Sequence, residues 1–177
     1  GLYYRANSKA WMTGILFQEW LNVVDKRMTL KKRKILLILD NALSHVIKDL
    51  PLKSIEICFL PPNATSRLQP MDQGIIAAFK KRFRSYQLEH ALEKLDEIDL
   101  NKTDRINIYK IDILKAMRWC QNAWNDISSA TIRNCWAHSG MIVNSPAPGS
   151  NSNLQAEDQK LDDELAQAMK KLAVNPF

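Results

Sequence analysis

The stretch that decides the fold runs from Ile35 to Asp72 and reads ILLILDNALSHVIKDLPLKSIEICFLPPNATSRLQPMD. It opens with five consecutive aliphatic residues, Ile35–Leu39, and contains a second apolar run, residues 55–60, that a proline pair ends. An aliphatic run without alternation is typical of a strand buried on both faces, as in the middle of an α/β sheet. The second run is also predicted to be a strand, which the prolines terminate because they cannot join a ladder.

Residues 40–54 separate the two runs, which leaves room for a crossover or a short helix. The default arrangement is a right-handed connection between two parallel strands. Asp40 then lies at the carboxyl end of a buried strand, the edge at which ligands bind in open α/β sheets. We therefore predict an α/β fold in which strands 35–39 and 55–60 are adjacent and parallel, with helices around them.

Asp72 stands at the start of a predicted helix. It follows Pro70, and apolar residues recur after it at helical spacing. These are Ile75, Ile76, Phe79, Phe83 and Tyr86. An acid in this place is typical of an N-cap or of a first-turn residue stabilised by the helix dipole. Asp40 has a corresponding interpretation as a turn acid that caps the next helix.

A second interpretation takes the two acids together. If Asp40 and Asp72 both face the same sheet edge, their carboxylates can share a divalent cation, since Mg²⁺ prefers hard oxygen ligands. Paired metals stabilise the attacking and leaving oxygens of a phosphodiester displacement. We expect the two carboxylates within about one shared-metal span, several ångströms, of each other.

Three segments carry a resemblance to a known family. They are LILDNA at residues 37–42 with His45 after it, FLPPNATS at residues 59–66, and LQPMDQG at residues 68–74. Together they resemble the DDE superfamily endonuclease domain, in its pogo/Tigger branch with centromere protein B and jerky-like relatives. The resemblance extends to residues 4–13 and to residues 131–140.

The resemblance implies an RNase H-like fold in which three acids hold two metal ions, Mg²⁺ or Mn²⁺. By position, Asp40 matches the second acid and Asp72 the third, so both are the expected catalytic and metal-binding residues. Asn41, His45 and Gln69 lie in the same motifs and are candidates to support them. The resemblance also implies DNA as the partner and the nucleus as the location.

The first acid of the family has no counterpart in this chain. It lies on the first strand of the fold, which is expected to precede Gly1, and Glu19 and Asp25 cannot replace it because they lie in or just after the first helix. We therefore expect an incomplete RNase H-like fold, a mixed sheet flanked by helices that lacks the first strand or strands. Metal-dependent cleavage and strand transfer belong to the intact family, and this chain alone is expected to bind DNA weakly without cutting it.

Two alternatives stay open. One is a catalytically dead transposase-derived module that binds DNA or protein. The other is a generic basic α/β domain in which Asp40 and Asp72 are caps.

Charge is uneven along the chain, whose net charge is +6. Residues 1–90 carry 15 Lys and Arg against seven Asp and Glu, and the remainder carries ten against 12. An excess of positive charge in the first half of the chain is typical of proteins that bind a polyanion.

The helix after Asp72 carries four cations, which we expect to contact DNA. The alternative is that they form a solvated face of the helix. They are Lys80, Lys81, Arg82 and Arg84.

Two other basic runs, Lys26-Arg27 and Lys31–Lys34, precede the strand at 35–39. They lie at its amino end, on the edge opposite Asp40. They suit contact with flanking DNA or a nuclear localisation signal.

Helices are predicted on both sides of the strands. Ser8 is expected to cap a helix whose core face holds an apolar stripe, namely Trp11, Met12, Ile15, Leu16, Trp20 and Leu21. Another helix is predicted from Ile108 to about Asn125, followed by one capped by Ser128 or Ser129. His138 has no identifiable partner, and a structural role is preferred for it.

The composition divides the chain into three parts. The family resemblance covers residues 1–143, which are the expected partial endonuclease domain. By composition, residues 144–153 are expected to be a flexible linker and residues 154–177 a charged helix or tail. The apolar stripe Leu161, Leu165 and Met169 on the last helix could dock on the domain itself, on a second copy or on another protein.

No apolar run reaches membrane-spanning length. The three scattered cysteines, Cys58, Cys120 and Cys135, suit a reducing compartment and form no metal-ligand pattern.

Overall fold

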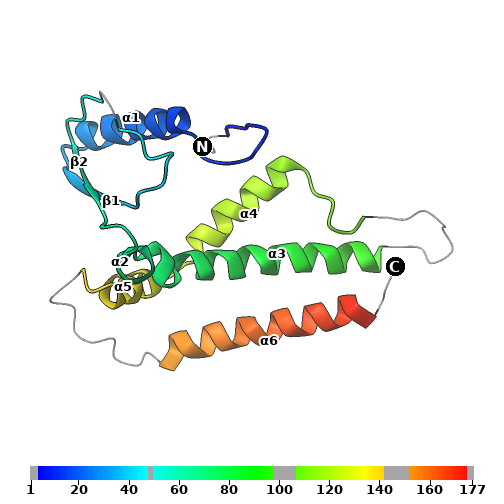
Figure 1. The fold of residues 1–177 in the computed structure, drawn as a ribbon. Coiled ribbons are helices and arrows are strands. Elements are labelled where there is room, and N and C mark those ends of the chain that lie inside the picture. Colours follow the sequence, from blue (N-terminus) through cyan, green and yellow to red (C-terminus); the bar gives the residue numbers. More distant parts are fainter. Residues whose placement is uncertain (1–3, 48–49, 98–106, 142–151, 175–177) are drawn as a thin grey trace. The chain divides into compact units, whose positions relative to one another are not determined.

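The computed structural model describes residues 4–47, 50–97, 107–141 and 152–174. The chain forms two compact units, Gly1–Asp72 and Gln73–Phe177. Each unit has a hydrophobic core of its own. The helices and strands of both are drawn in Figure 1. The described helices and strands make a mixed α/β protein.

The first unit contains α1 (Gly14–Leu30), β1 (Ile35–Leu39), β2 (Ile55–Phe59) and the short α2 (Thr65–Leu68) (Figure 1). β1 and β2 pair in parallel, with a register that runs from Ile35 opposite Ile55 to Leu39 opposite Phe59. The predicted adjacent, parallel strands are confirmed. The described residues of the crossover, 40–47 and 50–54, contain no helix.

The core of this unit lies between α1 and one face of the two strands. Phe17 and Leu21 of α1 pack with Leu39 and Ile55, and partly buried aliphatic residues surround them. The prediction that strand 35–39 is buried on both faces was wrong, since the Leu36 side chain is 57% exposed. Side chains alternate across a strand, and the described helix α1 covers only the face that carries Ile35, Leu37 and Leu39.

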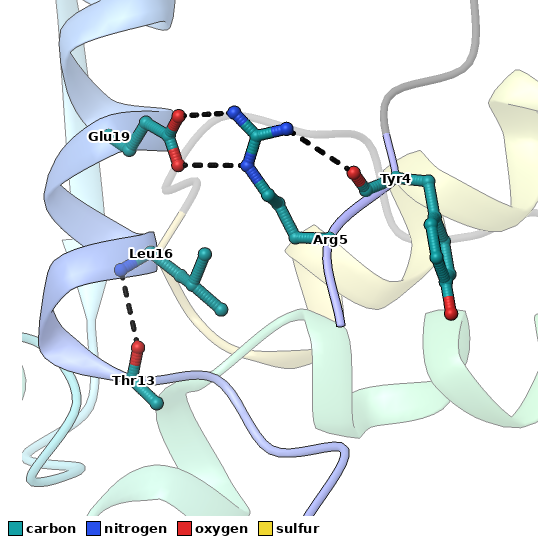
Figure 2. A network of polar contacts seen from close by, with 5 residues as sticks. All are labelled: Tyr4, Arg5, Thr13, Leu16 and Glu19. Atoms are coloured by element: carbon teal, nitrogen blue, oxygen red, sulfur yellow. Dashed lines mark hydrogen bonds and ion pairs between the residues drawn. The ribbon is translucent and has the colours of Figure 1, made fainter. Parts of the chain in front are cut away.

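α1 begins later than Ser8, which corrects the predicted cap. Thr13 is the N-cap, and its hydroxyl oxygen accepts a hydrogen bond from the Leu16 N–H at 3.3 Å (Figure 2). Residues before it form a turn in which Ala10 has φ +51°, a left-handed backbone that interrupts a helix. The predicted core face was wrong in part: Trp11 and Ile15 are exposed, while Leu21 lies in the core as predicted, together with Phe17.

Arg5 fastens the segment before α1 to the helix. Figure 2 shows its guanidinium group making two parallel hydrogen bonds to the Glu19 carboxylate, Nη2 to Oε1 at 2.5 Å and Nε to Oε2 at 3.2 Å. This bidentate arrangement fixes orientation as well as distance. Glu19 therefore has a structural partner within its own unit.

The second unit is helical. The turn Met71–Ile75, a π-helical segment that spans the boundary between the units, leads into α3 (Ile76–Asp96). α4 (Ile113–Asn125), α5 (Ser129–His138) and α6 (Ser152–Val174) follow (Figure 1). Its core cluster of Ile75, Ile127 and Cys135 is surrounded by Phe79, Ile132 and Trp136.

The helix boundaries agree in part with the sequence. α4 starts at Ile113 rather than Ile108, because the Asp112 carboxylate accepts the Lys115 N–H at 2.8 Å and caps it there. Ser128 caps α5 as one of the two predicted alternatives. The predicted linker lies outside the described residues up to residue 151. None of the described helices is long and apolar enough to cross a membrane.

α6 runs beside α3 (Figure 1). A groove of about 240 Å³ between them is lined by Leu88 and Leu92 of α3 and by Leu165 and Ala168 of α6. The last helix thus docks on its own domain, one of the alternatives that its sequence left open. Met169 is 53% exposed, so it does not belong to the docked stripe.

A buried carboxylate joins α1 to the start of β2. Asp25 is 7% exposed, and its oxygens accept hydrogen bonds from the backbone N–H groups of Lys53, Ser54 and Ile55 at 2.8–3.2 Å. These bonds, that from Ser54 first, lower the pKa of Asp25 below its usual value of 3.8, against the opposing effect of burial. The carboxylate thus provides a hydrogen-bond acceptor for three backbone N–H groups at the start of β2.

We predict that Asp25→Asn destabilises the first unit and speeds hydrogen exchange at the amides of Ser54 and Ile55. Because the folded pKa is lowered, the charge stabilises the fold above pH 3.8, and this stabilisation is lost as the pH falls through the folded pKa. The stability difference between the wild type and the variant should therefore shrink below that pH. Exchange measured by NMR across a pH series tests this.

Asp96→Asn is the matched control, since Asp96 is exposed on α3. It should leave the exchange of Ser54 and Ile55 unchanged. Equal protection of these amides in the Asp25→Asn variant and the wild type would show that the carboxylate does not hold β2.

Candidate metal and nucleic-acid site

Asp40 directly follows β1 and lies at its carboxyl end. Its Oδ1 accepts the Ala42 N–H at 3.1 Å, which closes an Asx-turn, and lies 2.8 Å from Nδ1 of His45. The same ring nitrogen lies 3.1 Å from the Asp40 carbonyl oxygen. The His45 ring packs against Phe17, with 4.8 Å between centroids, so α1 supports the histidine that contacts the acid.

Asn41 connects the carboxyl ends of the two strands. Its Nδ2 donates to the Leu60 carbonyl at 2.7 Å, while the Leu60 N–H donates to the Leu39 carbonyl at 2.8 Å. The loop that carries Asp40 is therefore tied to the end of β2. Asn41 and His45, the predicted supporting residues, both make polar contacts around the Asp40 loop.

Asp72 lies in the first turn of the π-helical segment, with an exposed side chain. Its N–H donates to the Gln69 carbonyl at 3.0 Å, which closes the turn that leads into α3. No described residue donates to the Asp72 carboxylate, so the acid is not a side-chain N-cap. Gln69 carries a buried Oε1 that has no hydrogen-bond partner among the described residues.

The donor chemistry of this region suits a hard cation only in part. Oδ2 of Asp40 and the Asp72 carboxylate receive no hydrogen bond from a described residue, and both are oxygen ligands of the kind that Mg²⁺ prefers. However, the described part of the chain gathers no group of three or more His, Cys, Asp or Glu that could hold a metal ion. That Asp40 and Asp72 approach within a shared-metal span stays a prediction.

The four cations of α3 differ in their surroundings. Lys80 and Arg84 are exposed. Lys81 is partly buried and lies 2.8 Å from the Asp162 carboxylate of α6. Arg82 donates from Nε to the Asp126 carbonyl at 3.0 Å. Two of these side chains thus contribute to packing in the second unit, while the other two face solvent.

Asp126, at the end of α4, is bonded twice to α3. Besides accepting from Arg82, it accepts the Tyr86 hydroxyl at Oδ2 at 2.6 Å. This hydrogen bond is the main reason that the pKa of Tyr86 is raised to about 12. The contact was not predicted from the sequence, because nothing in the spacing of residues 86 and 126 pairs them.

Two histidines also have partners that the sequence did not reveal. Nδ1 of His138 lies 2.7 Å from Oε1 of Gln73, which is the partner that could not be identified from the sequence. His90 is 6% exposed, with Nδ1 2.8 Å from Nζ of Lys115 and its ring edge-on to Trp119. The first contact joins α5 to the π-helical segment, and the contacts of His90 join α3 to α4, all within the second unit.

Gly74, two residues after Asp72, has a conformation that only glycine adopts easily. Its φ is +138°, and a Cβ built on it would lie 3.1 Å from the Sγ of the buried Cys135. The close approach lets the turn pack against α5. The glycine of the LQPMDQG segment is therefore required by backbone geometry rather than by chemistry.

Comparison with known proteins relates this chain, including the segments around Asp40 and Asp72, to one family. The family model of the DDE superfamily endonuclease matches residues 1–136. Among the relatives, CENP-B homolog protein 2 of Schizosaccharomyces pombe is 35% identical over 150 residues, which cover 80% of this chain and 28% of that protein. ARS-binding protein 1 of the same yeast is 30% identical over 147 residues, covering 78% of this chain and 27% of that protein. Tigger transposable element-derived protein 4 of Mus musculus is 28% identical over 140 residues, covering 78% and 25%.

The chain belongs to the DDE superfamily endonuclease family, and its relatives include CENP-B homologues and proteins derived from Tigger and pogo transposable elements. The resemblance to this family is confirmed. The chain spans about a quarter of the length of most of the relatives described here. No solved structure matches it.

We predict that Gly74→Ala destabilises the second unit by about 2–4 kcal/mol, the combined cost of an unfavourable φ and of crowding against Cys135. Gly140→Ala is the matched control, because Gly140 also has a positive φ, +71°, but a Cβ there meets nothing within 4 Å. The control should cost about 1 kcal/mol. Urea denaturation of the three proteins tests this, and equal losses for the two variants would contradict the proposed packing against Cys135.

Proposed function

We propose that this chain is the part of a pogo/Tigger-type DDE domain that carries its second and third acids, and that it binds DNA. The observation that carries the proposal is the position of Asp40 at the carboxyl end of a strand in a parallel pair, inside the segment that the family model matches. That edge is where open α/β sheets bind ligands.

The RNase H-like fold is the architecture that we propose for the first unit. Support comes from the strand–crossover–strand arrangement of β1 and β2, from their parallel pairing and from α1 against one face. Right-handed crossovers and covered faces are the rule for such sheets. In this proposal the two described strands are part of a larger mixed sheet flanked by helices.

Asp40 and Asp72 are the residues that would hold Mg²⁺ or Mn²⁺. Together with a third acid they would form the site of a metal pair, which would stabilise the attacking and leaving oxygens of a phosphodiester displacement; by themselves they would hold one cation. The chain's own contribution is that His45 and the Ala42 N–H engage Oδ1 of Asp40, which leaves Oδ2 as the oxygen available to a cation. Asn41 fixes the loop to the end of β2, and Gln69 offers an unpaired oxygen beside the turn that bears Asp72.

DNA is the proposed partner and the nucleus the proposed location. One relative is named an ARS-binding protein and others are named for transposable elements. The basic charge of the first 90 residues agrees with a polyanionic partner. On α3, we propose that Lys80 and Arg84 contact the DNA backbone first, and that Lys81 and Arg82 add contacts where their intramolecular partners release them.

A catalytically dead DNA- or protein-binding module is the second candidate. Two other acids of the first unit, Asp25 and Glu19, favour this candidate because both are engaged in structural contacts. Asp25 is enclosed by three backbone N–H groups at the amino end of β2, and Glu19 is bound to Arg5 on α1. Neither is placed to complete a set with Asp40.

We predict that replacing Lys80 and Arg84 together by glutamine weakens binding of a mixed-sequence DNA duplex. Each neutralised phosphate releases a counterion, so the slope of log K against log salt should become shallower by about two. Fluorescence anisotropy over a potassium chloride series measures both quantities.

The control for this experiment replaces Lys110 and Lys170, which are exposed and belong to other segments. It removes the same charge and should retain nearly the wild-type slope. If both double variants behave alike, binding depends on net charge rather than on the α3 surface, and the proposed contact is wrong.

We further predict that this chain alone does not nick plasmid DNA in Mg²⁺ or Mn²⁺. Two acids provide only part of a two-metal ligand set, and losing half of the stabilisation costs on the order of a thousandfold or more in rate. The assay runs the wild type beside Asp40→Ala. Cleavage that Asp40→Ala abolishes would show that another acid, from this chain or from a second copy, completes the site.

A further inference from the structure

A second basic surface lies at the opposite end of the first unit from Asp40. It consists of exposed cations from the end of α1, from the turn that follows and from the residue before Ser54. We call it the basic edge, and its members are Lys26, Arg27, Lys31, Lys32, Arg33, Lys34 and Lys53. None of them forms an ion pair with a described residue.

The turn after α1 holds its cations in a fixed conformation. The Arg33 N–H donates to the Met28 carbonyl at 2.9 Å and the Lys32 N–H to the Thr29 carbonyl at 3.0 Å. Lys32 itself has φ +52°. These three features together define a Schellman motif, in which a left-handed residue ends the helix and satisfies its last carbonyls. The basic run is therefore a structured helix end.

β-pairing brings a second segment beside this turn. The Ile35 N–H donates to the Ser54 carbonyl at 2.9 Å, which sets the start of β1 next to the start of β2. A groove of about 290 Å³ at these strand starts has Lys34 and Lys53 in its lining, together with Ser54 and one acid, Glu56. Cations that are far apart in the sequence thus converge on one concave surface.

Few negative charges oppose the cations of the basic edge. Asp25 is the nearest acid on α1, but its carboxylate is buried and occupied by the backbone N–H groups of residues 53–55. Glu56 is exposed in the lining of the same groove. Counted over the described residues, seven cations against these two acids leave a local positive excess, which attracts a polyanion and focuses its approach.

We propose that the basic edge is a second nucleic-acid-binding surface, which contacts the phosphate backbone. This second surface goes beyond the proposed function, since binding there requires neither a metal at Asp40 nor the cations of α3. A nuclear transport signal is the other interpretation of the run Lys31–Lys34. The structure favours the backbone contact, because the Schellman hydrogen bonds hold the run in a turn and because Lys53 comes from another segment. A transport receptor that reads an extended peptide would have to break this turn.

The test uses the full chain and a fluorescent mixed-sequence DNA duplex in a potassium chloride series. The variant replaces Lys31, Arg33 and Lys34 by glutamine and keeps Lys32, whose backbone ends α1. The slope of log K against log salt should become shallower by about 2–3, since each lost phosphate contact accounts for about 0.9. Lys53→Gln alone should reduce it by about one, because Lys53 lies on the same groove.

A matched control replaces Lys9, Lys110 and Lys170, which are exposed and lie outside the basic edge. It should retain nearly the wild-type slope. Hydrogen exchange at the Ser54 amide confirms that the variants keep the fold of the first unit. The variant of Lys80 and Arg84 is measured beside them, and if α3 does not bind DNA it retains the wild-type slope while the basic-edge variant still loses affinity.

A wild-type slope in the basic-edge variant would overturn the proposal. The same result combined with lost nuclear accumulation of the variant in cells would assign the run to transport. Equal losses in the basic-edge variant and its control would also overturn it, because net charge alone would then explain the binding.

Discussion

The first unit depends on the carboxylate of Asp25. It accepts three N–H groups at the start of β2, holds that segment against α1 and so places Ile55 in the core beside Leu21. With the starts of the two strands fixed, the parallel register brings Leu39 opposite Phe59 at their carboxyl ends. The position of Asp40 follows from this register. A buried acid at one edge of the sheet thereby sets the candidate site at the other.

The two proposed surfaces lie at opposite ends of the strand pair. At the carboxyl edge, His45 and Asn41 orient the loop around Asp40, where oxygen ligands suit a cation. At the amino ends of the strands, the cations of the basic edge present positive charge to which phosphate groups can bind. The two proposals, a cation at Asp40 and phosphate groups at the basic edge, therefore share no residue and can be tested separately.

The sequence predicted the parts that local patterns determine. The aliphatic run at Ile35–Leu39, the proline pair and the cap at Ser128 are local, and the strands and α5 lie where they were expected. The start of α1 was missed because Trp11 and Ile15 repeat at helical spacing but face solvent. Asp25 was missed as a core residue, although it follows Phe17 and Leu21 at intervals of four.

In the candidate site, only the residues that lie within sequence motifs could be predicted. Asp40 and Asp72 stand out by position, and Asn41 and His45 by their motif. By contrast, tertiary contacts such as that of Gln73 with His138 join residues that no spacing rule relates. The same holds for the hydrogen bond between Tyr86 and Asp126, which depends on how α3 and α4 pack.

The central claim is that Asp40 and Asp72 take one divalent cation together, and paramagnetic line broadening by Mn²⁺ in NMR spectra tests it most directly. The account predicts that amide signals around both acids broaden together, and that Asp40→Asn or Asp72→Asn alone removes the broadening at both places, since two oxygen ligands from separate segments hold the same ion. Broadening near only one acid, or broadening near Asp72 that survives Asp40→Asn, would contradict it.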